Sequence, residues 1–78
     1  MESHGVFDDE VQEILDGPDE ERRGRGGAME ASGQTRAGRY LRVIYVLEPQ
    51  GIFVLTAYEL RGSALTSFRR RRRRRWQR

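Results

Sequence analysis

The chain lacks cysteine and lysine, and its 78 residues include a single histidine, His4. Without cysteine it can form neither a disulfide nor a thiolate metal site, and one histidine cannot by itself hold a zinc ion. We therefore expect no metal and no other cofactor. The absence of lysine leaves arginine to carry all of the positive charge, and the planar guanidinium group binds phosphate through paired hydrogen bonds.

Long apolar runs are also missing. The longest uninterrupted one, Val43 to Leu47, is far below the roughly 20 residues needed to cross a bilayer, and no signal-peptide pattern opens the chain. We expect a cytoplasmic protein with no membrane contact. Residues 1–78 make a single small domain, and a chain of this size buries only about 60% of the surface that its unfolded form exposes.

Charge is segregated along the sequence. Residues 1–21 contain nine carboxylates and no arginine, whereas all fifteen arginines follow from Arg22 onward and face only three acids. The net charge of +3 therefore conceals an acidic segment and a strongly basic one. The acids could form a solvated helix face, or they could shield the arginines within the folded chain. The basic segment predicts a polyanionic partner, with nucleic acid considered first.

Seven consecutive arginines near the C-terminus carry most of that prediction. The residues expected to bind nucleic acid there are Arg69, Arg70, Arg71, Arg72, Arg73, Arg74 and Arg75, followed by Trp76, which could stack on an unpaired base. Residues 69–78 are interpreted as a basic tail or the end of a helix. Two other readings stay open: a solvated, disordered tail, or a surface that docks an acidic protein.

The pattern of apolar residues predicts an α+β fold. Val11, Ile14 and Leu15 have helical spacing and indicate a short helix over residues 8–16. Residues 19–27 are charged and rich in glycine, and we expect a mobile loop there. Three antiparallel strands are predicted, a weak one over 28–33 and strong ones over 40–47 and 52–58. Leu60, Ala64, Leu65 and Phe68 then indicate a C-terminal, arginine-rich helix capped by Ser63.

Two ordered sets of residues resemble the BrnT-like toxins. The first is His4-Gly5-Val6, then Asp8, Asp9, Glu10, Val11, Ile14 and Leu15, then Gly17-Pro18. The second runs from Gly33-Gln34-Thr35-Arg36-Ala37-Gly38-Arg39-Tyr40-Leu41 through Val43, Ile44 and Tyr45 to the strand Ile52 to Ala57. An arginine-rich helix ends that family as well, and the resemblance covers most of the chain.

The resemblance implies a RelE-like fold and a type II toxin–antitoxin system, in which a basic ribonuclease is held inactive by a partner antitoxin. Such toxins cut RNA without a metal, through attack by a 2′-hydroxyl that needs a proton acceptor, a proton donor and positive charge. The catalytic candidates are His4, Arg36 and Tyr58, and Arg39 is a candidate for phosphate binding. Tyr58 stands near the position where relatives carry a strand-end arginine, so it could supply the hydrogen bond in its place.

Simpler readings stay open for these residues. His4 could be an exposed or capping residue, and Arg36 and Arg39 flank Gly38 in a turn that could be polar merely because it is wet. Relatives begin with a further strand before His-Gly-Val, so we expect this chain to be short at its N-terminus. The sheet edge left open, or the strand near residues 28–33, would then favour pairing with a second copy.

The leading functional hypothesis is an RNA-binding toxin that is a metal-independent endoribonuclease under the control of an antitoxin protein. The first alternative is a non-catalytic nucleic-acid-binding module, such as a decayed toxin. The second alternative is an interaction protein whose basic helix docks an acidic partner.

Overall fold

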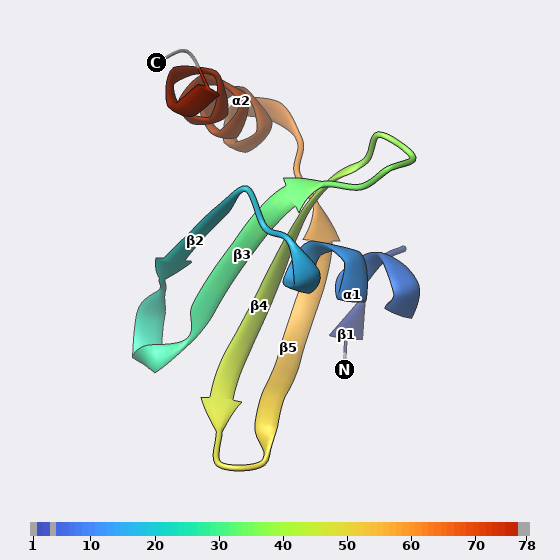
Figure 1. The fold of residues 1–78 in the computed structure, drawn as a ribbon, viewed down its shortest axis with the longest axis vertical. Coiled ribbons are helices and arrows are strands. Elements are labelled where there is room, and N and C mark those ends of the chain that lie inside the picture. Colours follow the sequence, from blue (N-terminus) through green and yellow to red (C-terminus); the bar gives the residue numbers. More distant parts are fainter. Residues whose placement is uncertain (1, 4, 77–78) are drawn as a thin grey trace.

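A computed structural model describes residues 2–3 and 5–76, and it has the predicted α+β fold of an N-terminal helix, an antiparallel sheet and a C-terminal helix (Figure 1). The elements in chain order are β1 (Glu2–Ser3), α1 (Asp8–Asp16), β2 (Glu20–Arg23), a 3-10 turn (Arg25–Gly27), β3 (Met29–Gln34), β4 (Tyr40–Glu48), β5 (Gly51–Glu59) and α2 (Gly62–Trp76). The predicted helix over residues 8–16 is confirmed. The three predicted strands correspond to β3, β4 and β5.

The strands form one sheet in the order β1-β5-β4-β3-β2. Strands β2 to β5 pair antiparallel with their neighbours, and β1 pairs parallel with β5 through Glu2–Thr56 and Ser3–Ala57. A register shift between Ile44 and Tyr45 inserts an extra residue into β5. Strand β3 therefore lies inside the sheet, and the expectation that its backbone could pair with a second copy is wrong.

The prediction of only three strands, with a loop over residues 19–27, was also wrong. Residues Glu20–Arg23 form β2, and its register places Glu20 opposite Ser32 and Arg22 opposite Glu30. The sequence Glu-Glu-Arg-Arg has no apolar residue, so neither alternation nor β-propensity indicates a strand. Charged side chains are nevertheless common on edge strands, where they discourage pairing with other chains.

One face of the sheet is covered by α1 (Figure 1). Val11 and Ile14 of α1 pack there against Leu41, Val43 and other buried side chains of the central strands, and Ile14 is 1% exposed. The helix begins after Phe7, whose backbone N–H donates to the Glu10 carboxylate at 3.1 Å. Acids crowd its first turn, where the positive end of the helix dipole stabilises them.

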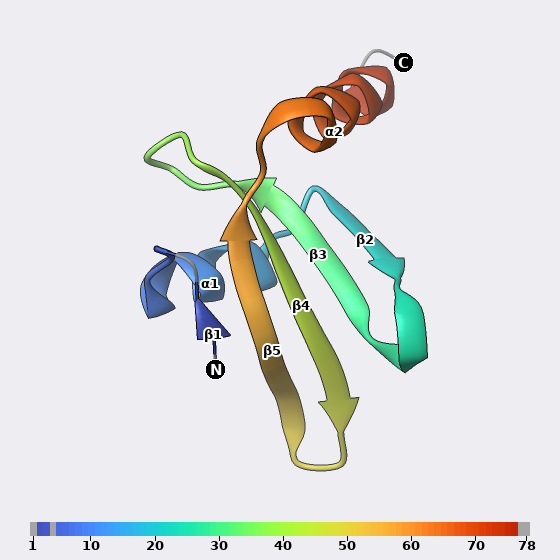
Figure 2. The same cartoon turned by 180° about the vertical axis from the view of Figure 1, so that it is seen from behind.

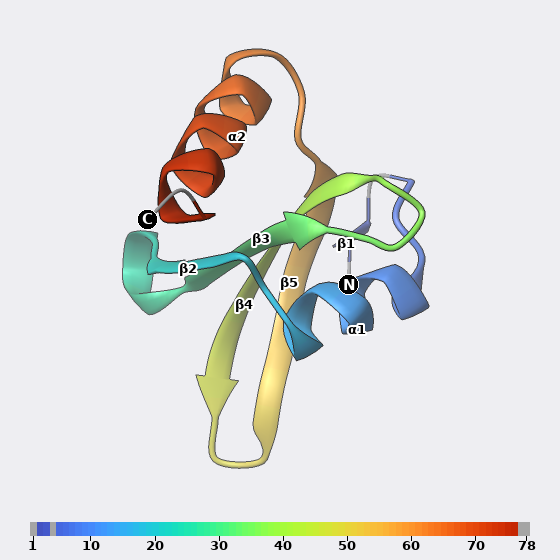
Figure 3. The same ribbon diagram turned by 45° about the horizontal axis from the view of Figure 1, so that its top comes forward.

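Helix α2 lies over one end of the sheet, beyond the carboxyl ends of β3 and β5 (Figures 2 and 3). Its anchor is Phe68, which is 1% exposed and meets the Tyr40 ring edge-on, with 6.0 Å between ring centroids. The helix begins at Gly62, which has φ of 57°. Ser63, which was predicted to cap the helix, therefore lies inside its first turn. Tyr40 and Arg42 alternate with Leu41 and Val43, so α2 contacts the face that α1 does not cover.

Apolar residues are exposed at the far end of the β4–β5 hairpin. They are Leu47, Ile52, Phe53 and Leu55, and Phe53 is 57% exposed. The expectation that Phe53 belongs to the core was therefore wrong, whereas Tyr45 and Phe68 are buried as predicted. Within residues 2–3 and 5–76, no helix is long and apolar enough to span a membrane.

Candidate nucleic-acid interface

The helical repeat of α2 distributes the arginine run over several directions. Arg71 and Arg72 are half-buried against the sheet, whereas Arg69, Arg70, Arg73 and Arg74 are exposed. An isolated helix of this composition would be weakened by repulsion between like charges three and four residues apart. Carboxylates from the acidic segment relieve part of that repulsion here.

Glu20 of β2 binds Arg71 through two hydrogen bonds. Arg71 Nε donates to Oε2 at 2.5 Å and Nη2 donates to Oε1 at 2.9 Å, and the Glu20 side chain is 11% exposed. The hydrogen bonds from Arg71 lower the pKa of Glu20 below its ordinary value, although burial opposes them. Glu20 therefore stays charged and fixes α2 to the edge strand.

Arg72 is held by two groups on the same side of the molecule. Its Nε lies 3.3 Å from Oδ2 of Asp19, and its Nη1 donates to Oε1 of Gln34 at 2.8 Å. Gln34 is the direct cross-strand partner of Tyr40, so these bonds place the Arg72 guanidinium beside the Tyr40 ring. The reading that the acidic segment shields arginines is thus confirmed for Arg71 and Arg72.

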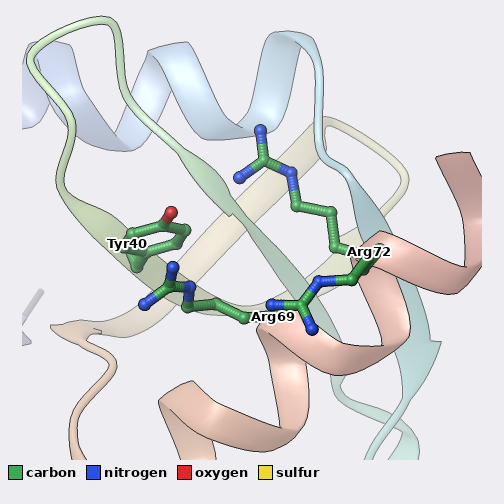
Figure 4. A pocket seen from close by; sticks show the side chains of 4 residues that line it. Tyr40, Arg69 and Arg72 are labelled. Atoms are coloured by element: carbon green, nitrogen blue, oxygen red, sulfur yellow. The ribbon is translucent and has the colours of Figure 1, made fainter.

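The Tyr40 ring lies close to two arginines of α2. The Arg69 Cζ is 5.7 Å and the Arg72 Cζ 5.9 Å from the centroid of its ring (Figure 4). Arg73 joins these three residues in lining a groove of about 360 Å³. Each guanidinium interacts favourably with the electron-rich ring face, and Arg69 and Arg73 are exposed. The groove therefore combines an aromatic ring with cations that are open to a ligand.

A second, smaller hollow of about 230 Å³ lies along the same helix. It is lined by Thr66, Arg69, Arg70 and Arg73. Arg69 and Arg73, one helical turn apart, border both hollows. The two hollows and this shared pair of arginines make one continuous basic surface, which we call the α2 groove.

Arg39, a predicted phosphate-binding residue, lies away from the α2 groove in a network of acids. Its Nη1 donates to Glu10 at 2.7 Å, and its Nη2 donates to the Gly5 carbonyl at 3.1 Å and to Glu59 at 3.4 Å. These bonds join the start of α1 to the end of β5. The position of Arg39 gives it a structural role between two elements.

The three catalytic candidates do not form one described cluster. Arg36 lies in the β3–β4 turn, where its backbone N–H donates to Glu13 and its side chain faces acids of α1. Tyr58 is the cross-strand partner of Arg42, so both side chains lie on the face of the sheet that α1 does not cover. His4 lies outside the described residues, as do the side chains of Arg75 and Trp76. In the described ranges, no group of histidine, cysteine and acidic residues has a geometry that could hold a metal ion.

Sequence reasoning missed Tyr40 as a functional residue, because it entered the prediction only as the start of a strand. A usable signal was present in α2. Phe68, Arg69 and Arg72 lie within one turn of each other, so the helix face that buries Phe68 also directs two arginines toward the same strand.

Comparisons of the chain with protein-family models, with curated proteins and with solved structures found no match. The chain is therefore described as a small α+β domain with a basic groove along its C-terminal helix.

Proposed function

We propose that the chain binds single-stranded RNA through the α2 groove. The observation that carries the proposal is the Tyr40 ring, close to Arg69 and Arg72 and adjoining the exposed Arg73. Proteins that bind single strands combine a basic groove for the backbone with aromatic rings on which unpaired bases stack. A volume of about 360 Å³ lies within the usual range for a small-molecule site, which suits one nucleotide.

The finer proposal is that this RNA-binding protein is a BrnT-like toxin. It rests on the resemblance of the His4 to Pro18 and Gly33 to Ala57 segments, and it implies metal-independent RNA cleavage and a partner antitoxin. His4, Arg36 and Tyr58 would take the proton-transfer and charge-stabilising roles. Support from the described geometry is stronger for RNA binding than for cleavage, because Arg36 and Tyr58 lie on different sides of the sheet.

Binding is tested by fluorescence anisotropy with a labelled single-stranded RNA over a range of salt concentrations. Arg69→Gln and Arg73→Gln should each weaken binding and reduce the slope of log K against log salt by about 0.7, which is the value for one phosphate contact on a single strand. Arg61→Gln is the matched control, because Arg61 is exposed and pairs with Glu59 before α2 begins. Equal losses in all three variants would contradict a localised groove.

Stacking is tested in the same assay by substituting Tyr40. Tyr40→Ala should reduce the affinity for single-stranded RNA about tenfold, since an aromatic stack contributes about 1–3 kcal/mol per base. Tyr40→Phe retains the ring and should bind like the parent protein. Circular dichroism checks that the Ala variant is folded, because Tyr40 also packs on Phe68. If Ala and Phe variants that remain folded bind alike, the base does not stack on Tyr40.

Cleavage is tested by incubating the RNA with the protein in EDTA and analysing the product ends. The toxin proposal predicts a 2′,3′-cyclic phosphate. His4→Ala should lower turnover about 10²–10⁴-fold, the usual contribution of general acid or base catalysis. Arg36→Ala should mainly weaken binding, and Tyr58→Phe should lower turnover if its hydroxyl takes part. RNA that stays intact from about pH 6 to 8 while bound would exclude the ribonuclease and leave the binding function.

A further inference from the structure

A third hollow, separate from the α2 groove, lies where the start of α2 meets the sheet. It has a volume of about 270 Å³ and is lined by Arg22, Arg42, Ser63, Ala64, Ser67 and Arg71. It shares no lining residue with the two hollows of the α2 groove. Three arginines, from β2, β4 and α2, and two serines therefore line the same hollow.

Arg42 is the buried member of this set. The residue is 8% exposed, and its Nε donates to Ser32 Oγ at 2.9 Å. The nearest acid, Glu30, lies 3.9 Å from the same Nε. Within residues 2–3 and 5–76, neither Nη1 nor Nη2 of Arg42 makes a hydrogen bond to protein. Among the described residues, Thr56 Oγ1 is the one buried side-chain polar atom without a partner, so the two amino groups of Arg42 reach solvent and are open to an acceptor.

The first turn of α2 borders the hollow. The first N–H groups of a helix have no partner within the helix, and the helix dipole places partial positive charge there. Ser63 and Ala64 lie in this first turn, and Ser67 follows one turn after Ser63 on the same face.

Acids around the hollow neutralise only part of this charge. Glu20 binds Arg71 through two hydrogen bonds, and Arg22 donates to Glu30 at 3.2 Å. The Arg71 hydrogen bonds and charge lower the pKa of Glu20 most, and burial opposes them. The charges of Arg22 and Arg42 lower this pKa by smaller amounts. Two carboxylates thus face three guanidinium groups and the start of a helix, which leaves an excess of positive charge.

We propose that this hollow is a binding site for a phosphate group, held by Arg42, Arg22 and the first turn of α2. A phosphate oxygen would accept the hydrogen bonds that the Arg42 amino groups lack. The site is independent of RNA binding by the α2 groove, because the two share no lining residue. Its ligand is either free phosphate or a phosphate of a nucleic acid.

The probe is inorganic phosphate, added at constant ionic strength with chloride as the balancing anion. We expect the Arg42 Nε–H signal in a ¹H–¹⁵N spectrum to shift with saturation, and Tm to rise by about 5 °C at a concentration of about five times Kd. Arg22→Gln, at a side chain that is 50% exposed, should weaken phosphate binding about tenfold or more. An Arg42 signal that responds equally to chloride would overturn the proposal.

A matched pair at Ala64 separates this hollow from the other arginines of α2. Ala64→Glu places a carboxylate in the hollow and should abolish the response of Arg42 to phosphate, whereas the neutral Ala64→Gln should retain at least part of it. An equal response in both variants would overturn the proposal. A short single-stranded RNA that displaces phosphate from the hollow would identify nucleic acid as the source of the phosphate. Failure to displace it would identify free phosphate, and RNA binding by the α2 groove would be unaffected.

Discussion

Glu20 has opposing effects on folding and on RNA binding. Its two hydrogen bonds to Arg71 fix α2 to β2, and the same carboxylate reduces the positive potential that RNA would meet. Because the pair is only partly buried, its contribution to stability is on the order of 1 kcal/mol. Removing its charge should therefore lower stability and raise RNA affinity.

The substitution Glu20→Gln tests the expected effect on stability. The pKa of Glu20 is lowered in the folded state, so the ion pair stabilises the fold above the ordinary value of 4.5, and that stabilisation is lost as pH falls through the lower folded value. The loss of unfolding free energy in the variant should be greatest near neutral pH and shrink below pH 4.5. Urea unfolding at several pH values measures this loss, with Glu48→Gln, at the exposed end of β4, as the control. A loss independent of pH would contradict the assignment.

Helix α2 is attached to the sheet by a small apolar contact and by ion pairs. Phe68 is its one fully buried residue among those described, and Arg71 and Arg72 bind acids of the segment around β2. The α1 face, in contrast, has a contiguous apolar core. We therefore expect α2 to detach from the sheet before the α1 face opens.

Phe68→Ala should expose this difference. The substitution removes a buried ring, a change that typically costs about 3–5 kcal/mol. Amide hydrogen exchange should become fast in α2 while Leu41 and Val43 stay protected, and RNA affinity should fall although every arginine remains. Phe68→Leu keeps most of the apolar contact and should show a milder effect. Loss of protection in α2 and the sheet together would mean that the two unfold as one unit.

Elements with apolar periodicity could be predicted from the sequence, and elements fixed by pairing could not. Val11, Ile14 and the β-branched residues of β4 and β5 indicated α1 and the central strands, because burial of one face requires that spacing. Strand β2 depends instead on its partner β3 and on ion pairs to residues about fifty positions away. The arginine run likewise predicted a basic surface, but only packing of α2 on β4 brings Tyr40 beside it.

The sheet of the molecule has an open edge along part of β5 in the β4–β5 hairpin. Strand β1 pairs only with Thr56 and Ala57, so in the described part of the chain the segment Gly51 to Leu55 has no partner on its outer side. Exposed Ile52 and Phe53 lie on that segment. Unpaired strand edges with apolar side chains favour association with another chain.

We expect the protein to self-associate through this segment of β5. Sedimentation velocity at micromolar concentrations should show an average mass that rises with concentration. Phe53→Lys should return the protein to a monomer by adding charge at the edge, and Gln50→Lys in the adjacent turn controls for the added charge alone. A parent protein that stays monomeric throughout this range would contradict the prediction.

The acids of α1 and the exposed arginines of α2 lie on opposite faces of the sheet, whereas Asp19 and Glu20 lie against Arg72 and Arg71. We expect the acidic first turn of α1 and the exposed arginines of α2 to give the molecule an electric dipole moment that its net charge of +3 does not reveal. Such a molecule is rotated by the field of a polyanion before contact, so collisions present α2 first. Association would then be faster than random orientation allows, and it would slow steeply with added salt while dissociation changes less.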